Sequence, residues 1–143
     1  MTRVTIEVTH DQAIAIRDAL ECYTRLCIGQ LEHVAEMLNE GTIPVGSLHN
    51  GEPRKTASRE VIDDTDRAMR GLKHLLGYSA NGSNGIGHGH VCIRGKRAWE
   101  IRKALSKALA EHRDPAPSFR GVDYDGRIVR YTGDPDAIVR VEE

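Results

Sequence analysis

Apolar side chains recur at intervals of three and four residues through the segment from His10 to Asn39. The stripe comprises Ile16, Leu20, Tyr23, Cys27, Leu31, Val34 and Leu38. This spacing places all of them on one side of an α-helix, and Thr9 followed by Gln12 predicts a capping box at its start. Gly29 interrupts the stripe at a cost of about 1 kcal/mol relative to alanine, which a helix tolerates where another backbone comes close. We therefore expect one long helix, which ends at Gly41.

Two further helical patterns follow the first. Ser58 predicts the N-cap of a helix that extends to Leu76, and Gly77 provides its C-terminal stop. A third helix is expected from Gly95 to His112, because two prolines soon after it prevent its continuation. Between the first two helices, residues 42–56 are rich in proline and glycine and predict an irregular connection.

Three short segments alternate apolar and polar residues, which is typical of half-buried strands. They are Arg3–Thr9, Arg127–Thr132 and Ala137–Glu142. A turn at Asp125–Gly126 precedes the last two, and the sequence GDPD separates them, so we expect a C-terminal hairpin. The predicted fold class is therefore α+β. In it, a small antiparallel sheet, made of the N-terminal strand and the hairpin, packs with the long helix and two further helices in a single domain over residues 1–143.

Length and charge limit the classes of protein to consider. The chain has 143 residues, enough for one domain with a core. Its 20 basic and 21 acidic residues give a net charge of −1, which disfavours a nucleic-acid binder that is basic throughout. Three cysteines without zinc-finger spacing predict reduced thiols in the cytosol. Neither a signal peptide nor an apolar stretch of membrane-spanning length is evident, so we expect a soluble intracellular protein with no membrane partner.

The sequence GYSANGSNGIGHGH, from Gly77 to His90, is a glycine-rich loop between two helical patterns. Neither a P-loop nor a dinucleotide-binding fingerprint fits the spacing of its glycines. His88, His90 and Cys92 are zinc-ligand types at alternating positions, but no fourth ligand follows at a suitable spacing, so no metal is expected. Two interpretations stay open. The segment is either a flexible loop with exposed histidines or a nest of backbone N–H groups that binds an anion such as phosphate.

Three cations stand at the start of the third predicted helix. Arg94, Lys96 and Arg97 lie where the helix dipole disfavours positive charge by several tenths of a kcal/mol each. A bound anion would reverse that sign, because the helix N-terminus, the glycine loop and the basic side chains would all favour it. The alternative is a solvated basic face, since further cations follow along the same helix.

No catalytic motif is evident in the chain. Cys22 and Cys27 fall on or beside the apolar stripe and are expected to pack there. A phosphodiesterase of the two-histidine class would need a duplicated pair of histidine and hydroxyl residues, whereas only His88 and His90 are present. We therefore expect no enzyme activity and no cofactor.

Taken in chain order, these features resemble those of a family of small proteins from tailed bacteriophages. They are a short strand, a long helix with ALECYTRLCIGQLEHVAEML, a helix that ends in GY, the loop NGSNGIGH, a basic helix and the tail FRGVDYDGRIVRYT. The chain is most similar, over nearly its whole length, to the first described type of phage Thoeris anti-defence sponges. The resemblance implies a protein of the host cytoplasm that binds, without cleaving, the cyclic ADP-ribose isomers made by immune TIR-domain proteins. It also implies capture of cyclic di- or trinucleotides, the signals of CBASS immunity, at separate sites, and assembly into a homo-oligomer, either a dimer or a hexamer.

The resemblance also assigns roles to residues by their position. Tyr78 would stack on a base, and Asn84 would contact the ligand. Arg120 and Asp123, in the segment FRGVD, would bind phosphate and ribose or base. Arg25, on the long helix, would suit a second nucleotide site at a subunit junction. The candidate ligand-binding set is completed by Arg54 or Arg59 as a further phosphate contact, by His88 in the glycine loop and by Arg94 at the start of the third helix.

A second hypothesis follows from the basic third helix alone. In it, the chain is a small intracellular phage regulator that binds protein or nucleic acid through this helix. Trp99 and the apolar face of the same helix argue against this hypothesis, and no helix-turn-helix spacing is visible. Nucleic acid is therefore not the partner that we expect.

Overall fold

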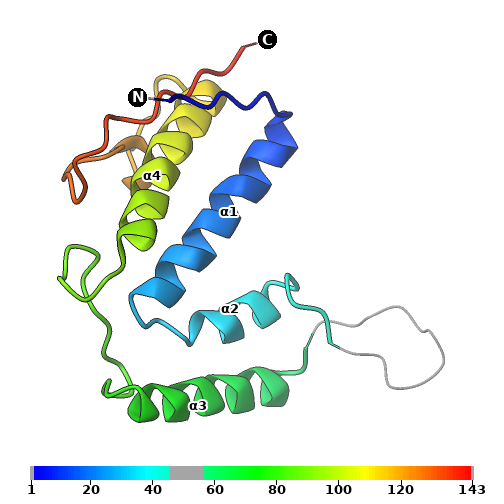
Figure 1. The fold of residues 1–143 in the computed structure, drawn as a ribbon. Helices are drawn as coiled ribbons and strands as arrows, with labels where there is room; N and C mark the ends of the chain where they lie inside the picture. The colour runs from blue at the N-terminus through cyan, green and yellow to red at the C-terminus, as the bar shows by residue number, and fades with distance from the viewer. Residues whose placement is uncertain (1, 46–56, 143) are drawn as a thin grey trace. The chain divides into compact units, whose positions relative to one another are not determined.

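The computed structural model describes residues 2–45 and 57–142, and all regular elements in that part of the chain are helical. They are α1 (His10–Cys27), α2 (His33–Asn39), α3 (Arg59–Leu75), α4 (Ile93–Arg113) and the short 3-10 helix η1 (Val122–Tyr124) (Figure 1). The chain divides into two compact units. The first unit comprises Met1–Thr24 and Ile86–Glu143, and the second unit comprises Arg25–Gly85. That the whole chain is one domain stays a prediction.

The predicted antiparallel sheet is wrong, because no described residue lies in a strand and the fold is all-α. The three segments predicted as strands are Arg3–Thr9, Arg127–Thr132 and Ala137–Glu142. In the first of them, Val4 and Ile6 are 83% and 70% exposed, so its alternation has no buried side. In the second, the Glu100 side chain accepts the backbone N–H groups of Tyr131 and Thr132 (2.8 and 2.9 Å). These contacts occupy donors that a neighbouring strand would need.

The single long helix predicted over His10–Asn39 is also wrong, because the chain turns at Gly29 between α1 and α2. Gly29 has a φ of +86°, a left-handed conformation that glycine adopts at the end of many helices. The N–H of Gln30 then donates to the carbonyl oxygen of Arg25 (2.9 Å). Since α2 continues the apolar spacing, the stripe covers two helices.

The predictions that rest on capping residues are confirmed. At the start of α1, the N–H of Thr9 donates to Oε1 of Gln12 (2.9 Å), and the N–H of Gln12 donates to Oγ1 of Thr9 (3.3 Å). At the start of α3, Oγ of Ser58 accepts the N–H of Val61 (3.3 Å). Gly77, with a φ of +84°, follows the end of α3. The irregular connection predicted over residues 42–56 falls mostly outside the described residues.

In the first unit, α1 and α4 lie side by side, and the start of α1 is beside the end of α4 (Figure 1). α4 is the predicted third helix and extends slightly past its predicted bounds at both ends. The buried core cluster is small and consists of Ala13, Leu105 and Leu109, with Ile14 and Val139 packed against it. Polar contacts supplement this core. The Nζ of Lys103 on α4 donates to the carbonyl oxygen of Val122 (2.8 Å). The hydroxyl of the buried Tyr124 donates to the backbone carbonyl oxygen of Asp114 (3.0 Å).

In the second unit, α2 packs against α3 (Figure 1). Ala35 and Leu38 of α2 are buried there, and Lys73 of α3 is fully buried. The Nζ of Lys73 lies 2.8 and 3.0 Å from the two carboxylate oxygens of Glu32. Burial opposes the ionisation of Glu32, but the hydrogen bond and positive charge of Lys73, a backbone hydrogen bond and the charge of Arg70 together outweigh it and hold the pKa of Glu32 below its ordinary value. The helices are therefore joined by an ion pair as well as by apolar contact.

None of the described helices has the length and apolar character that a membrane crossing requires.

Candidate functional site

Tyr78 and Asn84, the two loop residues expected to contact a ligand, are in direct contact in the second unit. The Nδ2 of Asn84 donates to the hydroxyl oxygen of Tyr78 (2.9 Å), and both side chains are half-buried. The Tyr78 ring lies over the backbone of Gly29, where an added Cβ would come 2.6 Å from the ring atom Cζ. Glycine at position 29 therefore both turns the chain and leaves room for the ring.

The chain from Gly77 to Gly85 is held in place by hydrogen bonds in its middle and near its C-terminal end. The N–H of Asn84 donates to the carbonyl oxygen of Ile28, just after α1 (2.8 Å). The guanidinium of Arg70, on α3, donates to the carbonyl oxygen of Ala80 (3.1 Å) and to the side chain of Asn81. Arg70 is itself oriented by Asp66, one turn earlier on α3 (2.7 Å). This part of the loop therefore has a defined conformation, although it contains no regular element.

Arg25, expected at a separate nucleotide site, lies in the same unit as this pair. Its Nη1 donates to Oε1 of Gln30 (2.8 Å), and the Nε2 of Gln30 is 3.5 Å from Oγ of Ser83. Ser83 directly precedes Asn84 in the chain. Two side-chain contacts thus connect Arg25 with the loop, through Gln30 and Ser83, which the sequence analysis missed. The left-handed turn at Gly29 is the signal that could have indicated this return of the chain.

Arg59 lies at the opposite end of α3 from Tyr78. At a rise of 1.5 Å per residue, the length of α3 separates them by roughly 25 Å. Arg59 forms an ion pair with Asp63 (3.1 Å) and lines a hollow of about 340 Å³ between α2 and α3. Most of the charged residues that line the hollow are acidic, among them Glu32 and Glu36. Arg59 is therefore not brought to the Tyr78–Asn84 pair.

The second half of the glycine loop, from Ile86 to His90, belongs to the first unit. Of the loop's glycines, only Gly77 has a left-handed φ, so the succession of conformations that forms an anion nest is not found. An added Cβ at Gly87 would lie 2.7 Å from the ring of Tyr131, and that ring in turn contacts Trp99 edge-on, with centroids 5.1 Å apart. The close approach of the Tyr131 ring therefore explains why position 87 is a glycine.

His88 and His90 are exposed, and their rings contact each other edge-on with centroids 4.8 Å apart. The Nδ1 of His88 accepts the N–H of His90 (3.2 Å). Cys92 caps α4, because its Sγ accepts the N–H of Gly95 (3.4 Å). No three side chains of the metal-binding types come together within the described residues.

The cations at the start of α4 are partly compensated within the chain. Arg97 forms a two-point ion pair with Asp134, and this contact lowers the pKa of Asp134 and raises that of Arg97. Arg94 is exposed on the first turn of α4. Since one of the three cations has its counter-charge in the chain, their clustering does not by itself require a bound anion.

Arg120 and Asp123 lie in the first unit, close to the end of α4. The guanidinium of Arg120 stacks on the ring of Tyr124, 5.4 Å from its centroid, and lies 4.0 Å from the carboxylate of Glu111. Asp123 is exposed in η1. This segment and the Tyr78–Asn84 pair therefore belong to different compact units.

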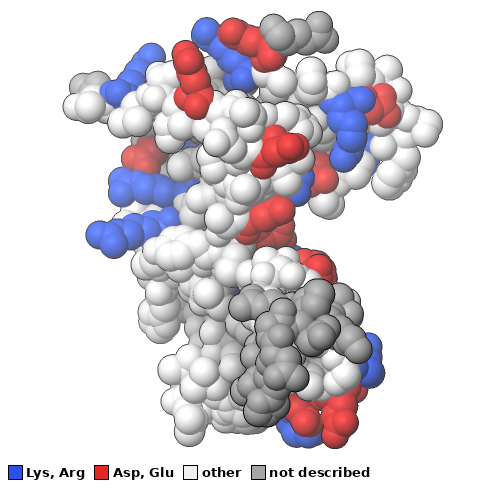
Figure 2. Space-filling view, turned by 90° about the vertical axis from the view of Figure 1, so that its right-hand side faces the viewer, with Lys and Arg blue, Asp and Glu red and all other residues white. Residues whose placement is uncertain are grey.

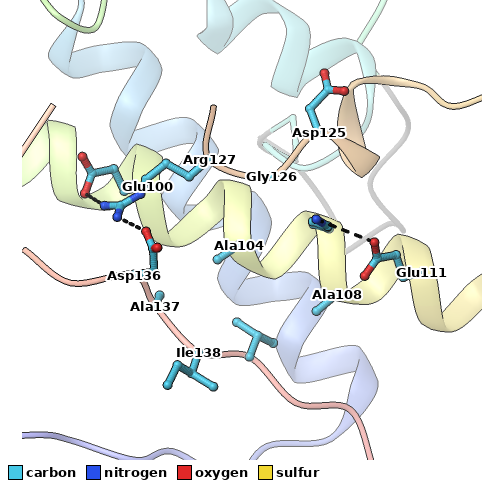
Figure 3. Close-up of a pocket in the computed structure, with 12 residues that line it drawn as sticks. Glu100, Ala104, Ala108, Glu111, Asp125, Gly126, Arg127, Asp136, Ala137 and Ile138 are labelled. Carbon is cyan, nitrogen blue, oxygen red and sulfur yellow. Dashed lines mark hydrogen bonds and ion pairs between the residues drawn. The ribbon is translucent and has the colours of Figure 1, made fainter. Parts of the chain in front are cut away.

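A groove of about 440 Å³ runs along α4 in the first unit (Figure 3). We call it the α4 groove. It is lined by Glu100, Ala104, Lys107, Ala108 and Glu111 of α4, by Asp125, Gly126 and Arg127, and by Asp136, Ala137, Ile138 and Val139. No feature of the sequence indicated it, because its two walls come from segments that were predicted as parts of a hairpin.

Glu100 anchors one end of this groove. Its carboxylate accepts the hydroxyl of Thr132 (2.8 Å), the N–H groups of Tyr131 and Thr132, and Nη1 of Arg127 (2.7 Å). Burial opposes the ionisation of Glu100, but these hydrogen bonds, that from the Thr132 hydroxyl first among them, hold its pKa below the ordinary value. Arg127 also pairs with Asp136 (Figure 3).

On the face shown in Figure 2, acidic and basic side chains are intermingled, and the described residues there form no continuous basic surface. Three of the cations on α4 have partners within the first unit. Arg97 pairs with Asp134, Arg102 lies 3.4 Å from Glu21, and Lys103 is buried. α4 is therefore not a basic recognition helix along its length.

Comparison with models of protein families, with curated proteins and with solved structures gives no match to this chain.

Proposed function

We propose that the protein binds, without cleaving, a cyclic nucleotide signal of bacterial immunity, and that it acts as a phage anti-defence sponge in the host cytoplasm. The ligands are cyclic ADP-ribose isomers and cyclic di- or trinucleotides. The observation that carries the proposal is the contact between Tyr78 and Asn84, which presents an aromatic ring beside an amide. A ring offers a stacking surface to a base, and the Oδ1 of Asn84 can accept from a base or ribose donor.

The arrangement around this pair suits binding without reaction. Tyr78, Asn84, Gln30 and Ser83 supply a ring, amides and a hydroxyl, and Arg25 supplies a guanidinium that can bind phosphate. A general base or a nucleophile with an activating partner would be needed for cleavage. The proposal includes neither, so the ligand should be released chemically unchanged.

We further propose that the protein is a homo-oligomer, a dimer or a hexamer, with α1 at an interface. Ile16 and Tyr23 of its apolar stripe are 37% and 43% exposed, and Leu26 of the same helix is 40% exposed. An apolar stripe that the protomer leaves accessible is available to a second copy.

The alternative is a regulator that binds protein or nucleic acid through α4. It is less well supported, because Arg97, Arg102 and Lys103 are engaged with Asp134, Glu21 and Val122 in the first unit. Phosphate contacts would have to break these interactions first. An electrophoretic shift with duplex DNA at low salt, lost on replacement of Arg94, would favour this alternative.

The decisive experiment incubates the protein with cyclic ADP-ribose isomers and cyclic oligonucleotides, denatures it by heat and analyses the released ligand by chromatography. Ligand that is depleted from solution and then recovered unchanged supports the proposal. Asn84→Ala should abolish the uptake, whereas Asn39→Ala, an amide of α2 outside this pair, should not. No uptake by the wild-type protein, or a chemically altered ligand, would contradict the proposal.

A further inference from the structure

His88 and His90 are carried by a turn that is fixed on both of its sides. The N–H of Val91 donates to the carbonyl oxygen of His88 (3.1 Å), which closes the turn. Before the turn, the backbone at Gly87 lies close to the ring of Tyr131, and after it Val91 is 3% exposed. The backbone of the two histidines is therefore held by contacts within the first unit, although both side chains are exposed.

The two imidazole rings have the separation of a pair that binds one metal ion together. Their centroids are 4.8 Å apart, and their planes are inclined at 79°. A zinc ion lies about 2.0–2.1 Å from an imidazole nitrogen and hence about 3.2 Å from the ring centroid. At coordination angles between about 90° and 109°, two rings on one zinc ion then have centroids about 4.5–5.2 Å apart. The separation of His88 and His90 falls within that range.

Each ring has a nitrogen that can bind a metal. The Nδ1 of His88 accepts the N–H of His90 (3.2 Å), so in the neutral ring this nitrogen carries a lone pair that is directed toward residue 90. A metal ion bound there would replace one long hydrogen bond. In the described part of the chain, no hydrogen bond or ion pair engages the ring nitrogens of His90. One ion can therefore bind Nδ1 of His88 and a ring nitrogen of His90.

The surroundings of the two rings suit an open site rather than a closed one. An added Cβ at Gly89, between the histidines, would meet no atom within 4 Å, so the turn is open there. A closed structural zinc site takes four protein ligands, and the lack of a fourth is the reason that the sequence indicates no metal. Two imidazoles leave the other positions of the ion to water. No third ligand joins the pair within the described residues, so we expect only a micromolar affinity.

We propose that His88 and His90 form a two-histidine site for zinc or another late divalent transition-metal ion. Imidazole is a ligand that zinc, copper and nickel prefer, whereas magnesium and calcium prefer oxygen. Cys92 is not part of the site, because its Sγ accepts the N–H of Gly95 at the start of α4. This inference goes beyond nucleotide binding and does not depend on it.

The first test titrates the reduced, chelator-treated protein with zinc chloride in a calorimeter. The wild type should bind zinc at micromolar concentrations, and His88→Gln and His90→Gln should each weaken this binding at least tenfold. The matched control is His10→Gln combined with His112→Gln, because these two rings are also neighbours in the first unit but have centroids 6.4 Å apart. The control should bind zinc like the wild type. No zinc binding by the wild type, or equal binding by the His88 and His90 variants, would overturn the proposal.

The second test identifies the atoms that bind the ion. X-ray absorption of the zinc-loaded protein should show two imidazole ligands, with oxygen in the remaining positions. Cys92→Ser should bind zinc like the wild type, since the thiol is not a ligand in the proposed site. A sulfur ligand in the spectrum, or loss of zinc binding in Cys92→Ser, would assign the ion to a thiol and contradict the proposal.

The third test separates metal binding from a structural role of the two rings. Both imidazoles are exposed, so His90→Gln should not change the thermal midpoint of unfolding in the absence of zinc. Saturating zinc should raise the midpoint of the wild type but not that of His90→Gln, because an ion that binds the folded protein stabilises it. If the variant is less stable without zinc and zinc raises both midpoints equally, the two rings only pack against each other and the proposal is refuted.

Discussion

Glu100 and Thr132 are joined by two hydrogen bonds that attach the C-terminal segment to α4. Oε1 of Glu100 accepts the backbone N–H of Thr132 (2.9 Å), and Oε2 accepts its hydroxyl (2.8 Å). Oε2 also accepts Nη1 of Arg127 (2.7 Å), and both charged side chains are more than nine-tenths buried. In a unit whose apolar core cluster is small, this carboxylate replaces the apolar contacts and strand pairing that would otherwise position the segment.

Glu100→Gln should therefore destabilise the protein strongly. Removal of the negative charge leaves Arg127 buried with less compensation, which costs about 3 kcal/mol in the free energy of unfolding. The measurement is equilibrium unfolding in urea. Glu111→Gln is the control, because Glu111 is 46% exposed and its ion pairs with Lys107 and Arg120 are long. That variant should change stability by less than about 1 kcal/mol, and an equal loss in both variants would contradict the role given to Glu100.

The stability of the protein should fall as the pH is lowered into the acid range. The pKa values of Glu100 and Glu32 are lower in the folded protein than the ordinary value of 4.5. The unfolded chain therefore binds more protons than the folded protein in this range, so stability rises with pH there. The contribution is complete above pH 4.5 and is lost as the pH falls through the lower, folded pKa values. Urea unfolding at a series of pH values between 3 and 7 measures it, and Glu100→Gln should remove part of this dependence.

Capping residues could be predicted because they act within a few residues of the chain. Thr9, Gln12 and Ser58 bond to N–H groups three residues away at most, so their sequence context contains the whole interaction. The end of α1 could not be predicted from its apolar stripe, because α2 continues the same spacing after the turn. Only the φ of Gly29 distinguishes one helix from two.

The strands were predicted wrongly because an alternation of apolar and polar residues is a property of one segment. It does not show which part of the chain that segment contacts. The partner of the segment at Tyr131 and Thr132 is the side chain of Glu100, about thirty residues earlier in the chain. Similarly, nothing in the sequence near Lys73 indicates that it is buried against Glu32, 41 residues away. Within the candidate site, Tyr78 and Asn84 were named because the resemblance to phage sponges assigns them ligand contacts by their positions in the glycine-rich loop. Gln30 could not be named in this way, since its contact with Ser83 depends on the turn at Gly29.

Gly29→Ala should reduce both stability and ligand uptake. The left-handed φ of +86° and the ring of Tyr78, 2.6 Å from the position of an added Cβ, both oppose a side chain there. The conformational part alone costs about 1–2 kcal/mol, and displacement of the ring disturbs the Tyr78–Asn84 pair. Gly71→Ala is the control, because position 71 lies within α3 with no atom near an added Cβ. It should stabilise the protein by up to about 1 kcal/mol.

Gly85 and Gly87 should respond differently to substitution by valine. An added Cβ at Gly87 meets the ring of Tyr131 at 2.7 Å, whereas one at Gly85 meets nothing within 4 Å. Gly87→Val should therefore lower the thermal midpoint of unfolding, and Gly85→Val should leave it nearly unchanged. If instead both variants fold normally and both lose ligand uptake, the glycines serve an anion nest that forms only around the ligand.

Arg25→Ala should weaken the uptake of cyclic ADP-ribose isomers and of cyclic oligonucleotides together. The resemblance to phage sponges placed Arg25 at a separate site, which predicts loss of the oligonucleotides alone. In the structure, however, Arg25 bonds to Gln30, and Gln30 contacts Ser83 beside Asn84, so the same network orients the loop for either ligand. Loss of a hydrogen bond to a charged group costs about 1.5–3 kcal/mol, or roughly ten- to a hundredfold in affinity. Titration calorimetry with each ligand measures the change, and Arg17→Ala, which removes a cation of α1 that pairs with its neighbour Asp18, is the control. If Arg25→Ala lowers only the affinity for oligonucleotides, the two ligands bind at independent sites. The contacts of Gln30 with Arg25 and Ser83 then do not contribute to the binding of cyclic ADP-ribose isomers.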